Sequence, residues 1–182
     1  EDGIRDVKTA REQTIEGSIL GAKRAVEEIQ ALAQIVKDIP SAIPTIALMD
    51  GTMIMMGLMD FGNRGFVLRE LVEEGFVAAL EDLRQTSKSR HLGLASYISL
   101  PGSTEVVNAL RLPACPYEVA DCDRYCGKLI NGLRPCDKSV GGLRDRDLFA
   151  KILHPEERSV LFRSESPFIK KYYKGHDIYF FY

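Results

Sequence analysis

The stretch TIALMDGTMIMMGL, residues 45–58, decides the fold because it places one acidic residue inside an apolar run. Residues 43–49 are mostly apolar, Asp50 and Gly51 interrupt them, and residues 52–59 are mostly apolar again. Short apolar runs bounded by turn residues are typical of buried strands. The stretch therefore predicts a buried strand pair, or one bent strand, with a carboxylate near its centre.

Asp50 has two interpretations at this point. A carboxylate between apolar strand segments must be paired, protonated or bound to a cation, and Gly51 beside it permits a close backbone approach to an ion or phosphate. Asp-Gly is also a strong signal for a tight hairpin, in which Asp50 is only a turn residue. The residues alone leave both interpretations open.

A long helix is predicted before this stretch, over residues 5–38. Its apolar side chains recur at alternating steps of four and three and share one face: Ile15, Ile19, Ala22, Val26, Ile29, Ala33 and Val36. Pro40 ends the pattern. We expect residues 1–40 to form an N-terminal helical element that packs either on a partner helix, across a dimer, or on its own sheet.

After the stretch, helical and strand patterns alternate. Residues 66–84, 103–112 and 144–153 read as helices, and residues 92–100, 159–164 and 176–182 read as strands. We expect residues 41–182 to form an α/β core with a mixed sheet flanked by helices. The last apolar strand runs to Tyr182 without a turn after it, so we expect the core to continue beyond this chain.

Composition narrows the class of protein. With 182 residues, 45% hydrophobic and 27% charged, the chain has enough apolar residues for a soluble globular domain and no uninterrupted membrane span. No export leader is visible, so we expect a cytoplasmic protein. The net charge of −2 disfavours a dedicated nucleic-acid-binding module. A local basic patch could compensate, and its candidates are Arg84, Lys88, Arg90, Arg144 and Arg146.

Other carboxylates begin predicted helices. Glu105 follows the strand at residues 92–100, and Asp145 and Asp147 precede the helix that ends near residue 153. Carboxylates that converge at strand and helix ends could hold Mg²⁺ or Mn²⁺. Acidic residues in a first helical turn are also favoured by the helix dipole and by capping alone.

All four cysteines fall within a segment rich in Pro, Gly and Asp, residues 113–142, which reads as an insertion: Cys115, Cys122, Cys126 and Cys136. In a reducing compartment such clustering favours a metal over disulfides. Four thiolates suit a structural Zn²⁺ or an iron–sulfur cluster, although the spacing differs from that of a zinc ribbon. Unligated thiols and disulfides remain the alternatives.

Four blocks of the sequence together resemble the NurA-domain nucleases. They are TIALMDGTMIMMGL (45–58), LGLASYISLPGSTEVVNALRL (92–112), GLRDRDLFAKILHPEERSVLFRSES (142–166) and HDIYFFY (176–182). The resemblance implies a ribonuclease-H-like fold and a dimeric, manganese-dependent nuclease. It also implies action on single- and double-stranded DNA ends in end resection, with the hexameric ATPase HerA as partner. The cysteine segment departs from the simpler archaeal pattern of the family.

The resemblance also implies site residues. Asp50 and Asp145 match metal-binding aspartates, Glu105 matches an intervening acidic position, and Tyr182 matches a tyrosine near the site. The family's catalytic histidine lies beyond the end of this chain, which implies that the chain alone lacks it. His91, His154 and His176 are better explained as surface or capping residues.

Two further hypotheses belong to other classes. The chain could be a non-catalytic scaffold that binds DNA or an ATPase through its helix and its cysteine segment. It could also be a ribonuclease-H-like enzyme acting on RNA or hybrids, because no motif here reports contacts to a 2′-hydroxyl.

Overall fold

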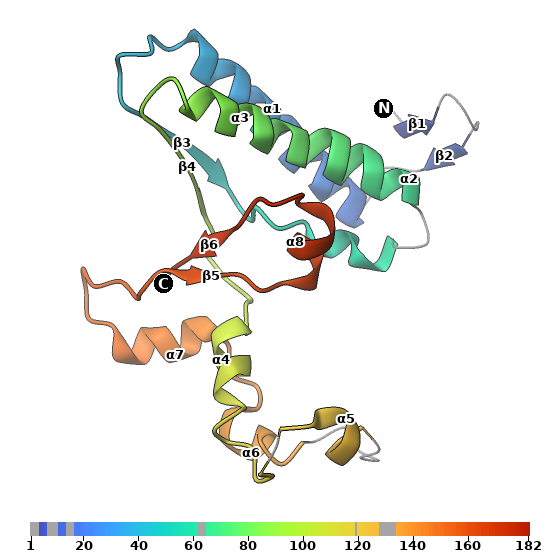
Figure 1. Ribbon diagram of the computed structural model, residues 1–182, viewed down its shortest axis with the longest axis vertical. Coiled ribbons are helices and arrows are strands. Elements are labelled where there is room, and N and C mark those ends of the chain that lie inside the picture. Colours follow the sequence, from blue (N-terminus) through green and yellow to red (C-terminus); the bar gives the residue numbers. More distant parts are fainter. Residues whose placement is uncertain (1–3, 7–10, 14–16, 62–64, 119, 128–133) are drawn as a thin grey trace. The chain divides into compact units, whose positions relative to one another are not determined.

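The computed structural model describes residues 4–6, 11–13, 17–61, 65–118, 120–127 and 134–182 (Figure 1). The chain divides into two compact units. Unit 1 contains Glu1–Ser99 and Ser166–Ile178, and unit 2 contains Leu100–Glu165 and Tyr179–Tyr182.

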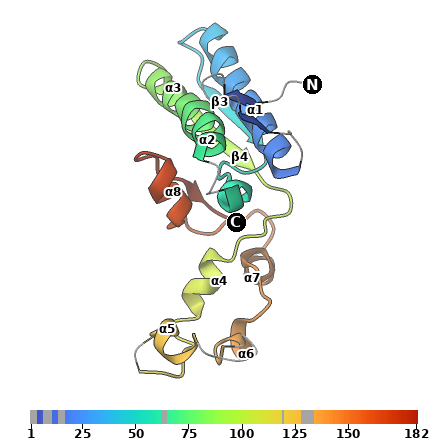
Figure 2. The same ribbon diagram turned by 90° about the vertical axis from the view of Figure 1, so that its right-hand side faces the viewer.

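Unit 1 is a layer of helices on a two-stranded sheet. Its elements are β1 (Ile4–Asp6), β2 (Arg11–Gln13), α1 (Gly17–Asp38), β3 (Thr45–Asp50), η1 (Met56–Phe61), α2 (Gly65–Val67), η2 (Leu68–Val77), α3 (Ala78–Ser87), β4 (Leu92–Tyr97) and α8 (Pro167–Tyr172). Helices α1 and α3 lie side by side, and α1 also contacts η2 and β3 (Figures 1 and 2).

The predicted apolar face of α1 is confirmed. Its buried residues are Ile19, Ala22, Val26, Ile29, Ala33 and Val36, while Ile15 lies outside the described residues. This face packs on the chain's own helices and on β3. The predicted start near residue 5 is wrong, because β1 and β2 pair as an antiparallel hairpin and α1 begins only at Gly17. Arg90 caps the other end by donating to the carbonyls of Val36 and Ile39.

The stretch around Asp50 is not a strand pair. Strand β3 ends at Asp50, and the apolar residues that follow lead into a 3₁₀-helix, η1. The partner of β3 is β4, which runs parallel to it with Thr45 opposite Leu92 and Asp50 opposite Tyr97. Burial alternates along β3, because Ala47 and Met49 face the helices while the side chains between them are exposed.

The helix predicted over residues 66–84 is confirmed as a continuous rod, α2–η2–α3, whose middle ten residues are wound as a π-helix. Gly75 of this rod packs directly against Val26 of α1. A Cβ placed on Gly75 would lie 3.0 and 3.2 Å from the two methyl carbons of Val26 and 2.9 Å from the Glu70 carbonyl oxygen. Only a residue without a Cβ lets the two helices pack at this distance.

Unit 2 consists of short elements. They are α4 (Glu105–Leu110), α5 (Cys122–Tyr125), α6 (Asp137–Val140), α7 (Asp145–Ile152), β5 (Phe162–Arg163) and β6 (Tyr179–Phe180). The expected helices at 103–112 and 144–153 correspond to α4 and α7. Aromatic rings hold α7 to the strands: Phe149 stacks on Tyr182 with ring centroids 4.7 Å apart and lies 5.9 Å from Phe162.

The described part of the chain is mixed helix and strand, as expected for an α/β protein, but its strands form three separate two-stranded sheets. The single mixed sheet fails to form here for two reasons. The apolar residues after Asp50 become helical, and β5 pairs with β6 instead of joining β3 and β4. None of the described helices combines the length and apolar character needed to cross a bilayer.

Candidate functional site

Asp50 occupies the carboxyl end of a parallel strand. The next residue, Gly51, has φ of +101°, and its N–H donates to the Tyr97 carbonyl at 2.9 Å. Few residues other than glycine adopt this backbone conformation at low cost, so Gly51 turns the chain out of the sheet directly after the carboxylate. The carboxyl ends of parallel strands are where α/β proteins gather ligands. Asp50 is exposed there, so it is neither buried between strands nor part of a hairpin.

A second carboxylate lies beside Asp50. The Asp50 N–H donates to Oε1 of Glu28, on α1, at 2.8 Å. Within the described ranges, no hydrogen bond or ion pair involves the Asp50 carboxylate itself. Sequence reasoning missed Glu28, whose only signal was its place between the core positions Val26 and Ile29. An exposed carboxylate with uncommitted oxygens next to a second acid can accept a hard cation.

Asp145, unlike the exposed Asp50, is fully buried in unit 2, with 0% of its surface exposed. Its Oδ1 accepts the N–H of Val107 at 2.8 Å, and its Oδ2 accepts the N–H of Val106 at 3.2 Å and the hydroxyl of Ser103 at 2.9 Å. Two of these donors belong to the first turn of α4. Asp145 therefore caps one helix while it starts another.

Tyr182 completes the donors around Asp145. Its hydroxyl donates to Oδ2 of Asp145 at 3.2 Å. Burial raises the pKa of Tyr182 to about 12, a hydrogen bond with Ser103 opposes that rise, and the negative charges of Asp145 and Glu105 add to it. Tyr182 therefore stays protonated over the whole physiological range and acts as a donor.

Glu105 belongs to the same neighbourhood. Its Oε1 accepts the Ser164 hydroxyl at 2.7 Å and its Oε2 accepts the Glu165 N–H at 3.2 Å. The Ser103 hydroxyl joins the two acids, since it donates to Asp145 and accepts the Glu105 N–H at 3.3 Å. Unit 2 thus brings Glu105, Asp145 and Tyr182 together, whereas Asp50 lies on unit 1.

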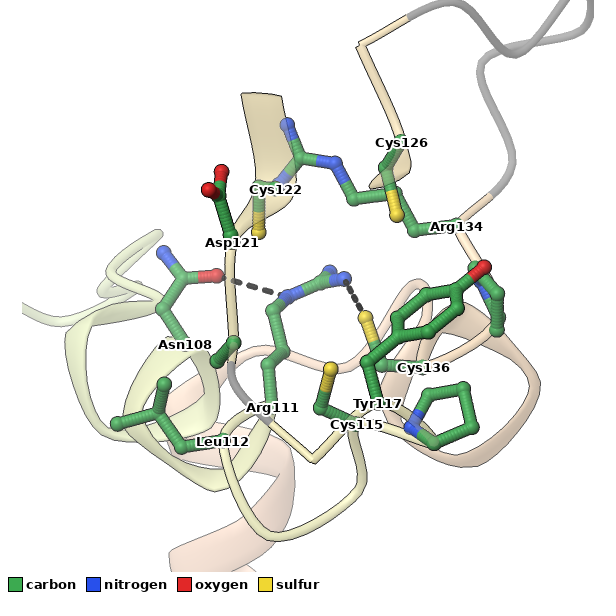
Figure 3. Close-up of a pocket in the computed structure, with 13 residues that line it drawn as sticks. Asn108, Arg111, Leu112, Cys115, Tyr117, Asp121, Cys122, Cys126, Arg134 and Cys136 are labelled. Atoms are coloured by element: carbon green, nitrogen blue, oxygen red, sulfur yellow. Dashed lines mark hydrogen bonds between the residues drawn. The ribbon is translucent and has the colours of Figure 1, made fainter. Parts of the chain in front are cut away.

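Unit 2 also contains a pocket of about 250 Å³ between α4, α5 and α6 (Figure 3). All four cysteines line it, together with Arg111 and Arg134. None of the cysteines forms a disulfide, and among the described residues no group of three or more His, Cys, Asp or Glu side chains is placed so that it could hold a metal ion as it stands.

A model of one protein family, the NurA domain, matches residues 3–182. The chain belongs to the NurA-domain family. No curated protein and no solved structure matches it. Membership in the NurA family indicates a nuclease-type role in DNA end processing, in agreement with the resemblance of the four sequence blocks.

The two aspartates of this NurA domain fit a metal ion unequally. Asp50 is exposed, and the Glu28 carboxylate contacts its main-chain N–H, so two acids of the kind that Mn²⁺ or Mg²⁺ prefers lie near one another. Asp145 already accepts four hydrogen bonds on its two oxygens, so a metal ion would have to displace donors that hold α4 in place. The Asp50 carboxylate therefore forms no hydrogen bond or ion pair among the described residues, whereas both oxygens of Asp145 are already occupied.

The candidate basic residues are largely committed to other contacts. Arg90 caps α1, and Arg84 donates to Glu81 at 2.8 Å and lowers the pKa of that carboxylate to about 2. In unit 2, Arg146 lies 3.6 Å from Asp147. Arg84 and Arg146 are therefore paired with acidic side chains, whereas the carbonyl partners of Arg90 leave its charge uncompensated.

Proposed function

We propose that this NurA domain is a metal-dependent nuclease that hydrolyses phosphodiester bonds at DNA ends, and that Asp50 anchors its Mn²⁺ or Mg²⁺. Support comes from one observation above the others. An exposed carboxylate with uncommitted oxygens ends a parallel strand and adjoins a second acid, Glu28. In α/β proteins this is the position where catalytic ligands are found.

The residues around Asp50 have distinct tasks in this proposal. A bound Mn²⁺ or Mg²⁺ supplies an activated water and stabilises charge on the leaving oxygen. Glu28 accepts the Asp50 N–H and so holds the main chain of the ligand in place. Gly51 turns the chain away without a side chain, which leaves room for a phosphate to approach the Asp50 carboxylate.

We also propose a ribonuclease-H-like core. Support comes from the parallel β3–β4 pair, the helical layer on one of its faces and the acid at the end of β3. The separate β5–β6 sheet does not supply further strands to this pair among the described residues.

The resemblance supports three partners, which we include in the proposal: DNA ends, a HerA-type hexameric ATPase and a second copy of the chain. The outer face of β3 is apolar and uncovered, with 76% of Ile46 and 60% of Leu48 exposed. Uncovered apolar area of this kind commonly marks a protein interface.

A non-catalytic scaffold is the second candidate. Asp145 acts as a helix cap, a role that does not require catalysis. The net charge of −2 also gives no sign of a surface built to bind DNA for cleavage. The two candidates differ in the role of Asp50: the nuclease needs it to bind a metal ion, whereas in the scaffold it serves only the fold.

The deciding experiment compares Asp50→Asn with the matched variant Asp38→Asn. Asp38 is also an exposed aspartate of unit 1, at the end of α1. Each variant is made in the full-length natural protein and incubated with Mn²⁺ and end-labelled single- and double-stranded DNA, and with matched RNA and hybrid duplexes. Mn²⁺ binding is measured separately by its paramagnetic signal, which does not require turnover.

We expect Asp38→Asn to match the unmodified chain and Asp50→Asn to bind Mn²⁺ at least about tenfold more weakly, with cleavage reduced at least in proportion. Equal Mn²⁺ binding in both variants would assign Asp50 to the fold and favour the scaffold. Preferential cleavage of RNA or hybrids would favour the ribonuclease hypothesis.

A further inference from the structure

The four cysteines face a common space. In Figure 3 the sulfur atoms of Cys115, Cys122, Cys126 and Cys136 point toward the middle of the pocket, where the Arg111 guanidinium lies. The thiols come from three separate pieces of backbone in unit 2. Thiols scattered over a chain surface have no reason to converge in this way.

Local structure explains how they converge. Cys122 begins α5, and the N–H of Cys126 donates to the Cys122 carbonyl at 2.9 Å, so the two thiols share one face of a single helical turn. Cys136 precedes the first residue of α6, and Cys115 lies in the turn after α4, where its N–H donates to the Leu112 carbonyl at 3.1 Å. Very short helices such as α5 and α6 have little stability of their own.

The electrostatics of the pocket suit thiolates. Arg111 donates to the sulfur of Cys136 at 3.7 Å, and Arg134 lines the same pocket. The charges of Cys122, Cys136 and Cys115 all act on Cys126, so the four sulfur groups lie within electrostatic range of one another. Four thiolates that crowd together need a cation between them.

Arg111 lies where such a cation would sit. Its guanidinium pairs with Asp137, on the first turn of α6, and its Nε donates to Asn108 at 3.0 Å. A zinc ion would take the centre only after the guanidinium moved aside and the four sulfur atoms closed around the ion. The displaced N–H groups would then donate to a metal-bound sulfur, as groups around metal sites commonly do.

We infer that Cys115, Cys122, Cys126 and Cys136 bind one structural Zn²⁺ in unit 2. Four thiolates are a complete tetrahedral ligand set for this ion, so no position is left for a reacting water. The zinc would hold α5 and α6 to the end of α4, where neither helix is long enough to persist alone. This role is separate from the hydrolysis proposed for Asp50.

The test uses the whole chain, purified without chelator or metal-affinity steps under reducing conditions. Metal content is measured by elemental analysis, and thiol accessibility is measured with a chromogenic disulfide reagent before and after chelation. Co²⁺ alone is added to the metal-free chain, because tetrahedral thiolate coordination gives Co²⁺ strong charge-transfer and ligand-field bands.

We expect one Zn²⁺ per chain, four thiols that become reactive only after chelation, and tetrahedral bands with Co²⁺. The double variant Cys122→Ser/Cys126→Ser should lose the ion. Asp123→Asn, in which an exposed neighbour on the same turn is changed and all four thiols remain, should keep it.

Three results would overturn the inference, and each is read on the unmodified chain, so misfolding of a variant cannot obscure them. The first is a chain without zinc whose four thiols react equally fast with and without added Zn²⁺. The second is a pair of disulfides that persists under reducing purification. The third is iron with acid-labile sulfide in place of zinc.

Discussion

Replacing Asp145 with alanine should destabilise unit 2 far more than replacing a surface aspartate with alanine. The buried carboxylate accepts two main-chain N–H groups of α4 and the hydroxyls of Ser103 and Tyr182. The hydroxyls can turn toward other acceptors, but the two N–H groups are fixed by the helix. A buried donor left without a partner costs about 1–3 kcal/mol, so two of them, with the lost packing, give about 3–5 kcal/mol.

The measurement is urea unfolding followed by far-ultraviolet circular dichroism and by tyrosine emission, which is usable because the chain has no tryptophan. Asp145→Asn keeps one acceptor oxygen and should lie between the alanine variant and the unmodified chain. The control is Asp147→Ala on the same helix, whose exposed carboxylate accepts the Arg144 N–H at 3.0 Å and lies 3.6 Å from the Arg146 guanidinium. Its expected cost is about 1 kcal/mol.

An Asp145→Ala chain as stable as Asp147→Ala would refute this reasoning. It would mean that burying the carboxylate costs as much free energy as its four hydrogen bonds return. A stable Asp145→Ala chain that has also lost Mn²⁺ affinity would restore Asp145 as a ligand.

Two predictions concern unit 1. Gly75→Ala should lower the free energy of unfolding by about 1–3 kcal/mol, because its Cβ would press on the Val26 methyl groups. The control is Gly65→Ala, where a Cβ meets nothing within 4 Å and the free energy of unfolding should not fall. Thermal denaturation compares the two variants. Tyr173→Phe removes a hydrogen bond to the Met53 carbonyl and should cost about 1–2 kcal/mol in urea unfolding. Burial raises the pKa of Tyr173 to about 12, so the unfolded chain ionises first and stability should fall as pH rises from about 10 to 12. The fall should be smaller in Tyr173→Phe.

Local patterns were enough to predict the long helices. Helix α1 shows its buried face in the spacing of residues such as Val26 and Ile29, and no other element is needed to see it. Strand β4 could be predicted for the same reason. The end of the strand at Asp50 was not predicted, because the apolar residues on both sides of Asp50 and Gly51 favour a strand pair or one bent strand.

Local patterns failed where distant residues decide the structure. Residues 52–59 are apolar enough for a strand, but they turn into η1 and fill the space beside α1, a choice made by tertiary packing. The donors that surround Asp145 lie far from it in the sequence: Val107 of α4 comes 38 residues before it and Tyr182 comes 37 residues after it. No rule of sequence spacing predicts such a network. None predicts that the Glu28 carboxylate accepts the Asp50 N–H.

Unit 2 is built from one long segment and from four residues that come much later, Tyr179–Tyr182. During synthesis the long segment therefore leaves the ribosome before its own last strand exists. Until then β5 has no partner, and the ring of Phe149 and the carboxylate of Asp145 both lack Tyr182. The edge of β5 in a nascent unit 2 therefore stays unpaired while the intervening residues 166–178, which belong to unit 1, are synthesised. The order in which the residues are synthesised therefore differs from the order in which the two units can fold, because unit 2 cannot form β6 until Tyr179–Tyr182 are present.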